Sequence, residues 1–282
     1  MPTTETFTDR IVSARGIRFH LLERGAPSSP PLVFLHGLTG HARTWDDEAQ
    51  SFADRFHVLA IDQRGHGDSD CAADGDYGNP AMVDDLAAIV DSLGLSRFDL
   101  VGLSMGGRVS IGYTGSHPGR VRRLVIVDIG PDIAAAGRNR VMGTMAGAPE
   151  RFATTDEALA FIRAGNPRYT DAKLRHRVEH GLRALPDGGF AWKYDRELRD
   201  GARQGRARPA GDLWAAWKAI DCPTLIVQCR ESDILDDAIA KCMMDEQPRA
   251  SLSVVADAGH TVPGDQPEAF LRLLNDFLTR EA

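Results

Sequence analysis

The pentapeptide GLSMG at positions 102–106 constrains this chain more than any other feature. It follows an apolar run, FDLVGL, and precedes a stretch with helical character. A G-x-S-x-G sequence between a strand and a helix predicts a sharp turn that holds its serine in a strained backbone conformation. The turn lifts the hydroxyl clear of the sheet edge, and the N-terminus of the helix stabilises negative charge there. We therefore expect Ser104 to be a nucleophile.

A serine hydroxyl is a weak nucleophile and needs a general base. Among the nine histidines, His260 follows an apolar run and precedes the last helical segment, where a loop at the end of the final strand would place it. His36 follows a strand and precedes a glycine, which is typical of a structural role in a loop. His66 lies in the tight turn RGHGDSD, where local hydrogen bonds are expected. The sequence thus predicts His260 as the base.

Two backbone N–H groups are needed to hold the oxyanion that forms when a serine attacks a carbonyl. Met105 directly follows the nucleophile, so its N–H is the first candidate. The second is the N–H of Leu38, in the segment HGLTG at 36–40 after the apolar run LVFL. We expect these two groups to form the oxyanion hole.

Strand and helix signals alternate along the first 130 residues. Apolar residues recur at helical spacing after Asn79 and Pro80, which are typical of an N-cap and a first helical turn, and a further helix is expected over 104–116. Short apolar runs predict strands at 17–22, 32–35, 56–61, 98–103 and 121–127. Continuous apolar strands separated by helices are typical of a parallel sheet covered on both faces.

The pattern changes after residue 130. Short helical segments replace the apolar runs as far as about residue 211, with a capping box at Thr154 and another helix start at Thr170 or Asp171. The final strand and helix signals lie at 223–227, 252–255 and 266–278. The sequence therefore predicts an α/β core and an inserted helical cap, over 1–130 with 216–282 and over 131–215, respectively.

The charge distribution follows the same boundary. The chain has 33 Lys and Arg, 40 Asp and Glu, and a net charge of −7. The segment 131–215 carries +4 and the remainder −11. An acidic chain is a poor general binder of nucleic acid or anionic membranes, so neither is expected as a partner. A basic cap over an acidic core indicates either a solvated helical surface or a cap that draws a small anionic substrate toward a cleft. A homodimer is a further candidate partner.

Targeting and redox signals are weak. No apolar run approaches the ~20 residues needed to span a bilayer. The start, MPTTETFTDR, lacks the basic-then-apolar pattern of a signal peptide, so we expect a cytoplasmic protein. The scattered cysteines predict reduced, mostly buried thiols and neither a disulfide framework nor a zinc site; they are Cys71, Cys222, Cys229 and Cys242.

Four motifs in order resemble the α/β-hydrolase fold family with a helical cap: HG at 36–37, DQRGHGDSD at 62–70, GLSMGG at 102–107 and AGH at 258–260. The resemblance covers nearly the whole core and is weak in the cap. It implies a mostly parallel, eight-stranded sheet flanked by helices. It also implies acyl transfer to water without metal or organic cofactor, at a small ester, lactone or amide bond. A serine nucleophile disfavours dehalogenation and epoxide opening, which relatives perform with aspartate. Two alternatives stay open: a carbon–carbon bond hydrolase of diketo acids, and a non-catalytic ligand receptor.

Two aspartates compete for the third position of a catalytic triad. The common family position follows the strand PTLIVQ at 223–228 and would be Asp233, although Cys229 stands where many members have glycine and Asp233 lies one residue too far along. A minority branch has its acid after the preceding core strand, where this chain has Asp128. A carboxylate that follows a buried apolar strand needs a polar partner, which favours Asp128. Asp233 stays the alternative acid, with a helix cap as its other expected role.

One further carboxylate and four cap residues complete the candidates. We expect Asp62 to pair with Arg64 or with its own turn rather than to take part in catalysis. In the cap, cationic and aromatic side chains predict binding of a carboxylate-bearing substrate; they are Arg140, Arg168, Tyr169 and Trp192. Asp128 combined with Arg168 and Tyr169 resembles hydrolases of (E)-2-(acetamidomethylene)succinate, which cleave an amide-type bond of a dicarboxylate.

Overall fold

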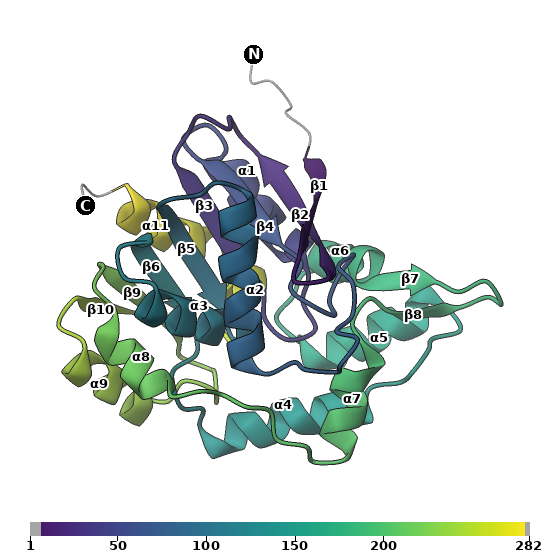
Figure 1. Ribbon diagram of the computed structural model, residues 1–282. Coiled ribbons are helices and arrows are strands. Elements are labelled where there is room, and N and C mark those ends of the chain that lie inside the picture. Colours follow the sequence, from purple (N-terminus) through teal and green to yellow (C-terminus); the bar gives the residue numbers. More distant parts are fainter. Residues whose placement is uncertain (1–6, 280–282) are drawn as a thin grey trace.

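The computed structural model describes residues 7–279. The strands of its main sheet are β1 Thr8–Ala14, β2 Ile17–Arg24, β3 Pro31–Leu35, β4 His57–Ile61, β5 Phe98–Leu103, β6 Val121–Val127, β9 Thr224–Cys229 and β10 Ala250–Val255. They lie in the order β1-β2-β4-β3-β5-β6-β9-β10 (Figure 1). β1 and β2 are antiparallel to their neighbours, and the other six strands of the sheet run parallel: β4, β3, β5, β6, β9 and β10. The predicted α/β fold with a mostly parallel, eight-stranded sheet is confirmed.

The helices cover both faces of this sheet. They are α1 Asp46–Phe52, α2 Asn79–Ser92, α3 Met105–Ser116, α4 Ala135–Gly147, α5 Thr155–Gly165, α6 Asp171–Gly181, α7 Arg196–Arg203, α8 Leu213–Ala219, α9 Asp237–Glu246, α10 Val262–Asp265 and α11 Pro267–Leu278, with a 3-10 turn η1 over Ala42–Trp45. In β3, Val33 and Leu35 belong to one apolar cluster and Leu32 and Phe34 to the other. Successive residues of a strand point to opposite faces, so α2 and α3 cover one face while α1 and α11 cover the other (Figure 1).

The segment between β6 and β9 holds α4 to α8 and a short antiparallel hairpin, β7 Leu182–Ala184 with β8 Phe190–Trp192. This hairpin was not predicted, because three-residue strands carry too little periodicity to stand out from the flanking helices. Thr154 caps α5 by accepting a hydrogen bond from the Glu157 N–H, and Thr170, rather than Asp171, caps α6. The exact boundaries of the cap stay a prediction.

Three local predictions need correction. The N-cap of α2 is Gly78 rather than Asn79, because the Asn79 N–H donates to the carbonyl oxygen of Pro209 at 2.8 Å and the extended residue is Gly78. β1 was missed, since this edge strand is mostly exposed and has no apolar run. Two of the four free thiols, Cys71 and Cys242, are exposed rather than buried. Within residues 7–279, no helix is long and apolar enough to cross a membrane.

Candidate active site

Ser104 occupies the turn between β5 and α3. Its backbone has φ 53° and ψ −115°, a strained region that non-glycine residues rarely adopt. The two flanking glycines are required by close packing. A Cβ on Gly102 would clash with Ser110 and with the backbone of Gly106, and a Cβ on Gly106 would clash with the carbonyl group of Leu35. The sheet and helix therefore meet too closely at this turn for any other residue type.

Three side chains from separate loops meet at this turn. The Ser104 Oγ lies 2.8 Å from Nε2 of His260, and Nδ1 of His260 lies 2.8 Å from Oδ2 of Asp128. Asp128 is fully buried, and its Oδ1 accepts a hydrogen bond of 3.0 Å from the Cys229 N–H. Each carboxylate oxygen of Asp128 therefore has a polar partner, as a buried charge requires. The structure thus brings Asp128, rather than Asp233, to the imidazole.

Strand order places Asp128 near the nucleophile. β6 lies directly beside β9, and the Asp128 N–H donates to the carbonyl oxygen of Val227 at 2.8 Å. The residue after β6 therefore lies at the same edge of the sheet as Ser104, which follows the neighbouring strand β5. Asp128 also has a positive φ of 49°. This turn away from the strand direction is compatible with the carboxylate's bond to His260.

Asp233 faces the cap instead. The Arg140 guanidinium donates to both of its carboxylate oxygens, at 2.6–3.1 Å. This pairing holds the pKa of the Asp233 carboxyl below its usual range. The expectation that Asp233 caps a helix is wrong. Asp236 caps α9, where its side chain accepts a hydrogen bond from the Ile239 N–H at 2.8 Å.

Asp62 is a structural acid that fastens the loops around the site. Its carboxylate accepts hydrogen bonds from Nδ1 of His20 at 2.7 Å, the Ala42 N–H at 2.6 Å and the Asp68 N–H at 3.0 Å. Burial raises the pKa of Asp62, but hydrogen bonding, led by His20, outweighs it and the pKa falls to about 2. The bond to Asp68 lies within the expected turn. The expected pairing with Arg64 is wrong, because that guanidinium pairs with Asp85 of α2.

The two rival histidines have structural partners. Nδ1 of His36 donates to the carbonyl oxygen of Gly37 at 2.8 Å, while Nε2 accepts from the Gln63 N–H at 3.1 Å. Nδ1 of His66 lies 2.9 Å from the carbonyl oxygen of Arg64, as the local turn predicted. Burial lowers the pKa of His36, and it lowers the pKa of His66 to about 3. Burial therefore favours the neutral form of both imidazoles.

Leu38 and Met105, whose N–H groups are expected to form the oxyanion hole, line a cavity together with Ser104. Met105 is the first residue of α3, so its N–H has no acceptor within the helix. The loop that carries Leu38 comes close to the nucleophile, since a Cβ on Gly37 would lie 3.1 Å from Cβ of Ser104. Leu38 also lines each cavity that opens at Ser104.

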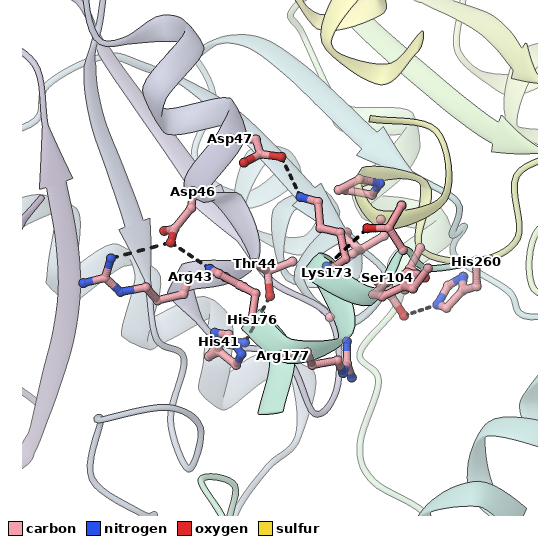
Figure 2. A pocket seen from close by; sticks show the side chains of 18 of the residues that line it. His41, Arg43, Thr44, Asp46, Asp47, Ser104, Lys173, His176, Arg177 and His260 are labelled. Atoms are coloured by element: carbon pink, nitrogen blue, oxygen red, sulfur yellow. Dashed lines mark hydrogen bonds and ion pairs between the residues drawn. The ribbon is translucent and has the colours of Figure 1, made fainter. Parts of the chain in front are cut away.

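Three cavities meet at Ser104. The largest, which we call the cap cavity, has a volume of about 830 Å³ and lies under α4, α5 and the β8 strand. A second, which we call the α6 cavity, has about 340 Å³ and lies between η1, the start of α1 and α6 (Figure 2). The third, of about 180 Å³, is bounded by α2, α3 and α4. A substrate bound at Ser104 therefore has separate spaces for its different groups.

The four cap residues predicted to bind substrate all line these cavities. Arg140, Arg168 and Trp192 line the cap cavity, and Tyr169 lines the α6 cavity. Their states differ. Arg140 is already paired with Asp233, whereas the Arg168 guanidinium lies 3.9 Å from the Glu231 carboxylate and is 41% exposed. The Trp192 indole N–H donates to a backbone carbonyl oxygen at 2.9 Å, so the ring lines the cavity as an apolar surface.

Arg177 is a candidate that the sequence did not reveal. It lines both the α6 cavity (Figure 2) and the cap cavity. Its guanidinium donates to Thr39 Oγ1 at 3.1 Å. Within the described part of the chain it has no ion-pair partner. The segment RHRVEH at 175–180 is strongly charged, but nothing in it indicates which residue of α6 faces the cleft. Only the docking of α6 reveals that.

The fold and the position of this site are those of the α/β hydrolases. The chain belongs to the alpha/beta hydrolase family, whose model matches residues 32–273. A crystal structure of E-2-(acetamidomethylene)succinate hydrolase superposes with a TM-score of 0.89 at 26% identity and covers 98% of this chain and 100% of that chain. The 2-(acetamidomethylene)succinate hydrolase of Mesorhizobium japonicum is 27% identical, with 98% of this chain and 96% of the relative covered. The resemblance seen in the motifs is confirmed.

A Bacillus subtilis protein provisionally named 2-succinyl-6-hydroxy-2,4-cyclohexadiene-1-carboxylate synthase is 30% identical, with 96% of this chain and 98% of that protein covered. Other relatives are named as esterases and hydrolases, among them a 2-hydroxymuconate semialdehyde hydrolase of Pseudomonas sp.. The protein is therefore a hydrolase, and the alternative of a non-catalytic receptor falls away.

Proposed function

We propose that the protein is a serine hydrolase that cleaves a small, carboxylate-bearing ester, lactone or amide through an acyl-enzyme. The observation that carries this proposal is the unbroken chain of hydrogen bonds from Ser104 through His260 to Asp128, with both contacts at 2.8 Å. A serine in this arrangement loses its proton to the imidazole as it attacks a carbonyl carbon. No metal or organic cofactor takes part in that step.

The steps follow from the positions of the groups. Nε2 of His260 takes the Ser104 proton, and the Leu38 and Met105 N–H groups stabilise the tetrahedral oxyanion. The imidazolium then gives its proton to the leaving group, which departs and leaves the acyl group on Ser104. His260 next takes a proton from water, whose oxygen attacks the acyl carbon; the imidazolium then returns this proton to the Ser104 oxygen as the acyl bond breaks and the acid leaves. Asp128 holds the Nδ1 proton and stabilises the imidazolium throughout.

Arginines in the cavities support a substrate with carboxylates. Arg177 reaches the cap and α6 cavities without an acidic partner in residues 7–279, and Arg168 has only a distant one. Guanidinium groups bind carboxylates through two parallel hydrogen bonds. The names of two relatives also specify acids, a succinate and a cyclohexadiene carboxylate. Within this class we favour an amide of the (acetamidomethylene)succinate type, because that hydrolase matches the chain in both comparisons.

A substrate panel tests the proposal. Esters, lactones and enamides, each with and without carboxylates, are compared by kcat/KM, and p-nitrophenyl acetate serves as a neutral reference. We expect turnover to be highest for the carboxylate-bearing compounds. Ser104→Ala should abolish it, with a loss on the order of 10⁴-fold or more. Undiminished turnover by Ser104→Ala would refute the serine mechanism, and equal rates with neutral compounds would refute the preference for carboxylates.

A carbon–carbon bond hydrolase of diketo acids is the second candidate. The similarity to the 2-hydroxymuconate semialdehyde hydrolase, at 28% identity over 95% of this chain, favours it. The cap cavity of about 830 Å³ is large enough for an extended acid. Ring-fission diketo acids in the same panel separate the two functions, because this candidate predicts a higher kcat/KM for them than for any ester or amide.

A further inference from the structure

A second group of reactive side chains lies apart from the triad, and two of its three members line the α6 cavity. His176 and His180 are one helical turn apart on α6 and therefore lie on the same face. Asp46, the first residue of α1, faces them from the core, and its Oδ2 lies 3.0 Å from Nε2 of His176 (Figure 2). One ligand atom from each of the three lies within 4.8 Å of the others.

The polar atoms of this cluster are only partly satisfied by the protein. Oδ1 of Asp46 is buried, and in the described residues it has no hydrogen-bond partner. The rings of His176 and His180 meet edge to face at 4.5 Å. His41 lies edge-on to His180 at 6.3 Å, is 5% exposed, and has a buried Nδ1 without a partner in residues 7–279. Buried polar atoms rarely stay without a partner, and an ordered water or a bound ion can supply one.

We propose that Asp46, His176 and His180 bind one divalent transition metal ion of the zinc class. Two imidazole nitrogens and one carboxylate oxygen form a donor set that zinc prefers. Bonds of about 2.0–2.2 Å place two ligands of one ion roughly 3–4 Å apart, so small side-chain rotations close the present arrangement around an ion. The sequence did not indicate a metal site, because residue 46 lies far from 176 and 180 along the chain.

The position of the site gives it a regulatory consequence. Asp46 belongs to the core and the two histidines to the cap segment, so a bound ion joins α6 to α1. Asp46 and His176 line the cavity that contains Ser104, and α6 also carries Arg177. An ion here narrows that cavity and restrains the helix that holds the free arginine. We therefore expect a bound ion to lower turnover, and assays of wild-type protein and His180→Ala with and without ZnCl₂ measure this; equal inhibition of both proteins would contradict it. The main competitor of the ion is the Arg43 guanidinium, 3.5 Å from the Asp46 carboxylate.

Titration of the metal-free protein with ZnCl₂ tests the site directly. Calorimetry measures stoichiometry and Kd, and CoCl₂ provides a visible absorption band that reports tetrahedral nitrogen and oxygen ligation. We expect one ion per chain and a higher melting temperature in its presence. His180→Ala and Asp46→Asn should each weaken Kd by at least about tenfold, because each removes a direct ligand. If one variant fails to fold, the other decides the question.

Two controls make the result specific to this cluster. His117→Ala removes a histidine that is outside it, at the end of α3, and should leave Kd unchanged. His260→Ala removes the catalytic imidazole, which also lines the α6 cavity, and should likewise keep zinc binding. Loss of binding in His260→Ala together with retention in His180→Ala would place the ion at the triad and overturn the proposal. Absence of zinc binding by the wild-type protein would overturn it as well. Neither outcome bears on the serine mechanism, which Ser104→Ala tests separately.

Discussion

The two sides of the cleft differ in how their charged groups are held. On the core side, Asp128 is fully buried, and each of its oxygens accepts a hydrogen bond from a fixed partner. On the cap side, Arg168 is 41% exposed and lies 3.9 Å from Glu231. Preorganised groups stabilise a transition state without reorganisation at the moment of reaction, whereas exposed arginines can adjust to different acids. We therefore propose that the core determines whether a bond is cleaved and that the cap determines which substrate is bound.

We expect the largest effect when the two candidate acids, Asp128 and Asp233, are each replaced. Asp128→Asn should lower kcat about 10⁴-fold, because an amide cannot hold the histidine in the required tautomer or stabilise its charge. Asp233→Asn should cost at most about tenfold, since that side chain pairs with Arg140 and not with the imidazole. Steady-state kinetics of both variants on one substrate measure the difference. Equal losses would mean that Asp233 shares the role of the triad acid.

The core also holds one buried acid, Glu48, that has no hydrogen-bond partner in residues 7–279. This acid should make the stability of the protein depend on pH. Glu48 of α1 is 0% exposed, and neither carboxylate oxygen has a hydrogen-bond partner in the described residues. Burial raises its pKa from 4.5 to about 8. The pKa of Glu48 is higher in the folded state than in the unfolded state. Its contribution to the free energy of unfolding is therefore fully present below pH 4.5 and is lost as the pH rises through 8.

Glu48→Gln tests this statement. At each pH, the free energy of unfolding of the variant is compared with that of the wild-type protein. This difference should shift in favour of the variant by about 2 kcal/mol or more between pH 5 and pH 8.5, because each pKa unit corresponds to about 1.4 kcal/mol. Chemical denaturation at the two pH values provides the measurement. Asp47→Asn, an exposed neighbour that pairs with Lys173, is the matched control and should show little pH dependence. A wild-type stability that is flat between these pH values would contradict the prediction.

Arginines on the cap side should affect substrate preference rather than the chemical step. Arg168→Ala and Arg177→Gln should each lower kcat/KM for carboxylate-bearing substrates about 10- to 100-fold, the expected cost of a lost charge-assisted hydrogen bond. Activity on neutral small esters should be retained. Arg140→Gln is the comparison, with a smaller loss, since its charge is already neutralised by Asp233. Equal losses on charged and neutral substrates would exclude an anion-binding role for the residue concerned.

The same contrast explains which features the sequence could predict. The turn at Ser104 is local, and the order of strand, glycine, serine and helix was enough to find it. The choice of Asp128 over Asp233 depends on β6 lying beside β9, a long-range contact that only a buried-charge argument could favour. Arg177 was missed because the face that α6 presents depends on how the cap docks. The pairing of Arg64 with Asp85 was missed for a similar reason, because Asp85 lies in α2 and reaches Arg64 only once that helix has docked.

The smallest expected effect concerns Thr154, the N-terminal capping residue of helix α5 in the inserted segment. The Thr154 hydroxyl accepts a hydrogen bond of 3.2 Å from the Glu157 N–H, and it begins the helix that brings Phe161 to the cap cavity. Thr154→Ala should lower the free energy of unfolding by about 1 kcal/mol. Thr155→Ala, one residue later and without a capping bond, is the matched control and should cost less. Urea denaturation of both variants measures this difference, while kcat on a neutral ester should stay unchanged in each. A fall in that kcat would show that α5 also supports the catalytic groups. In that case the cap would affect the chemical step as well as substrate binding.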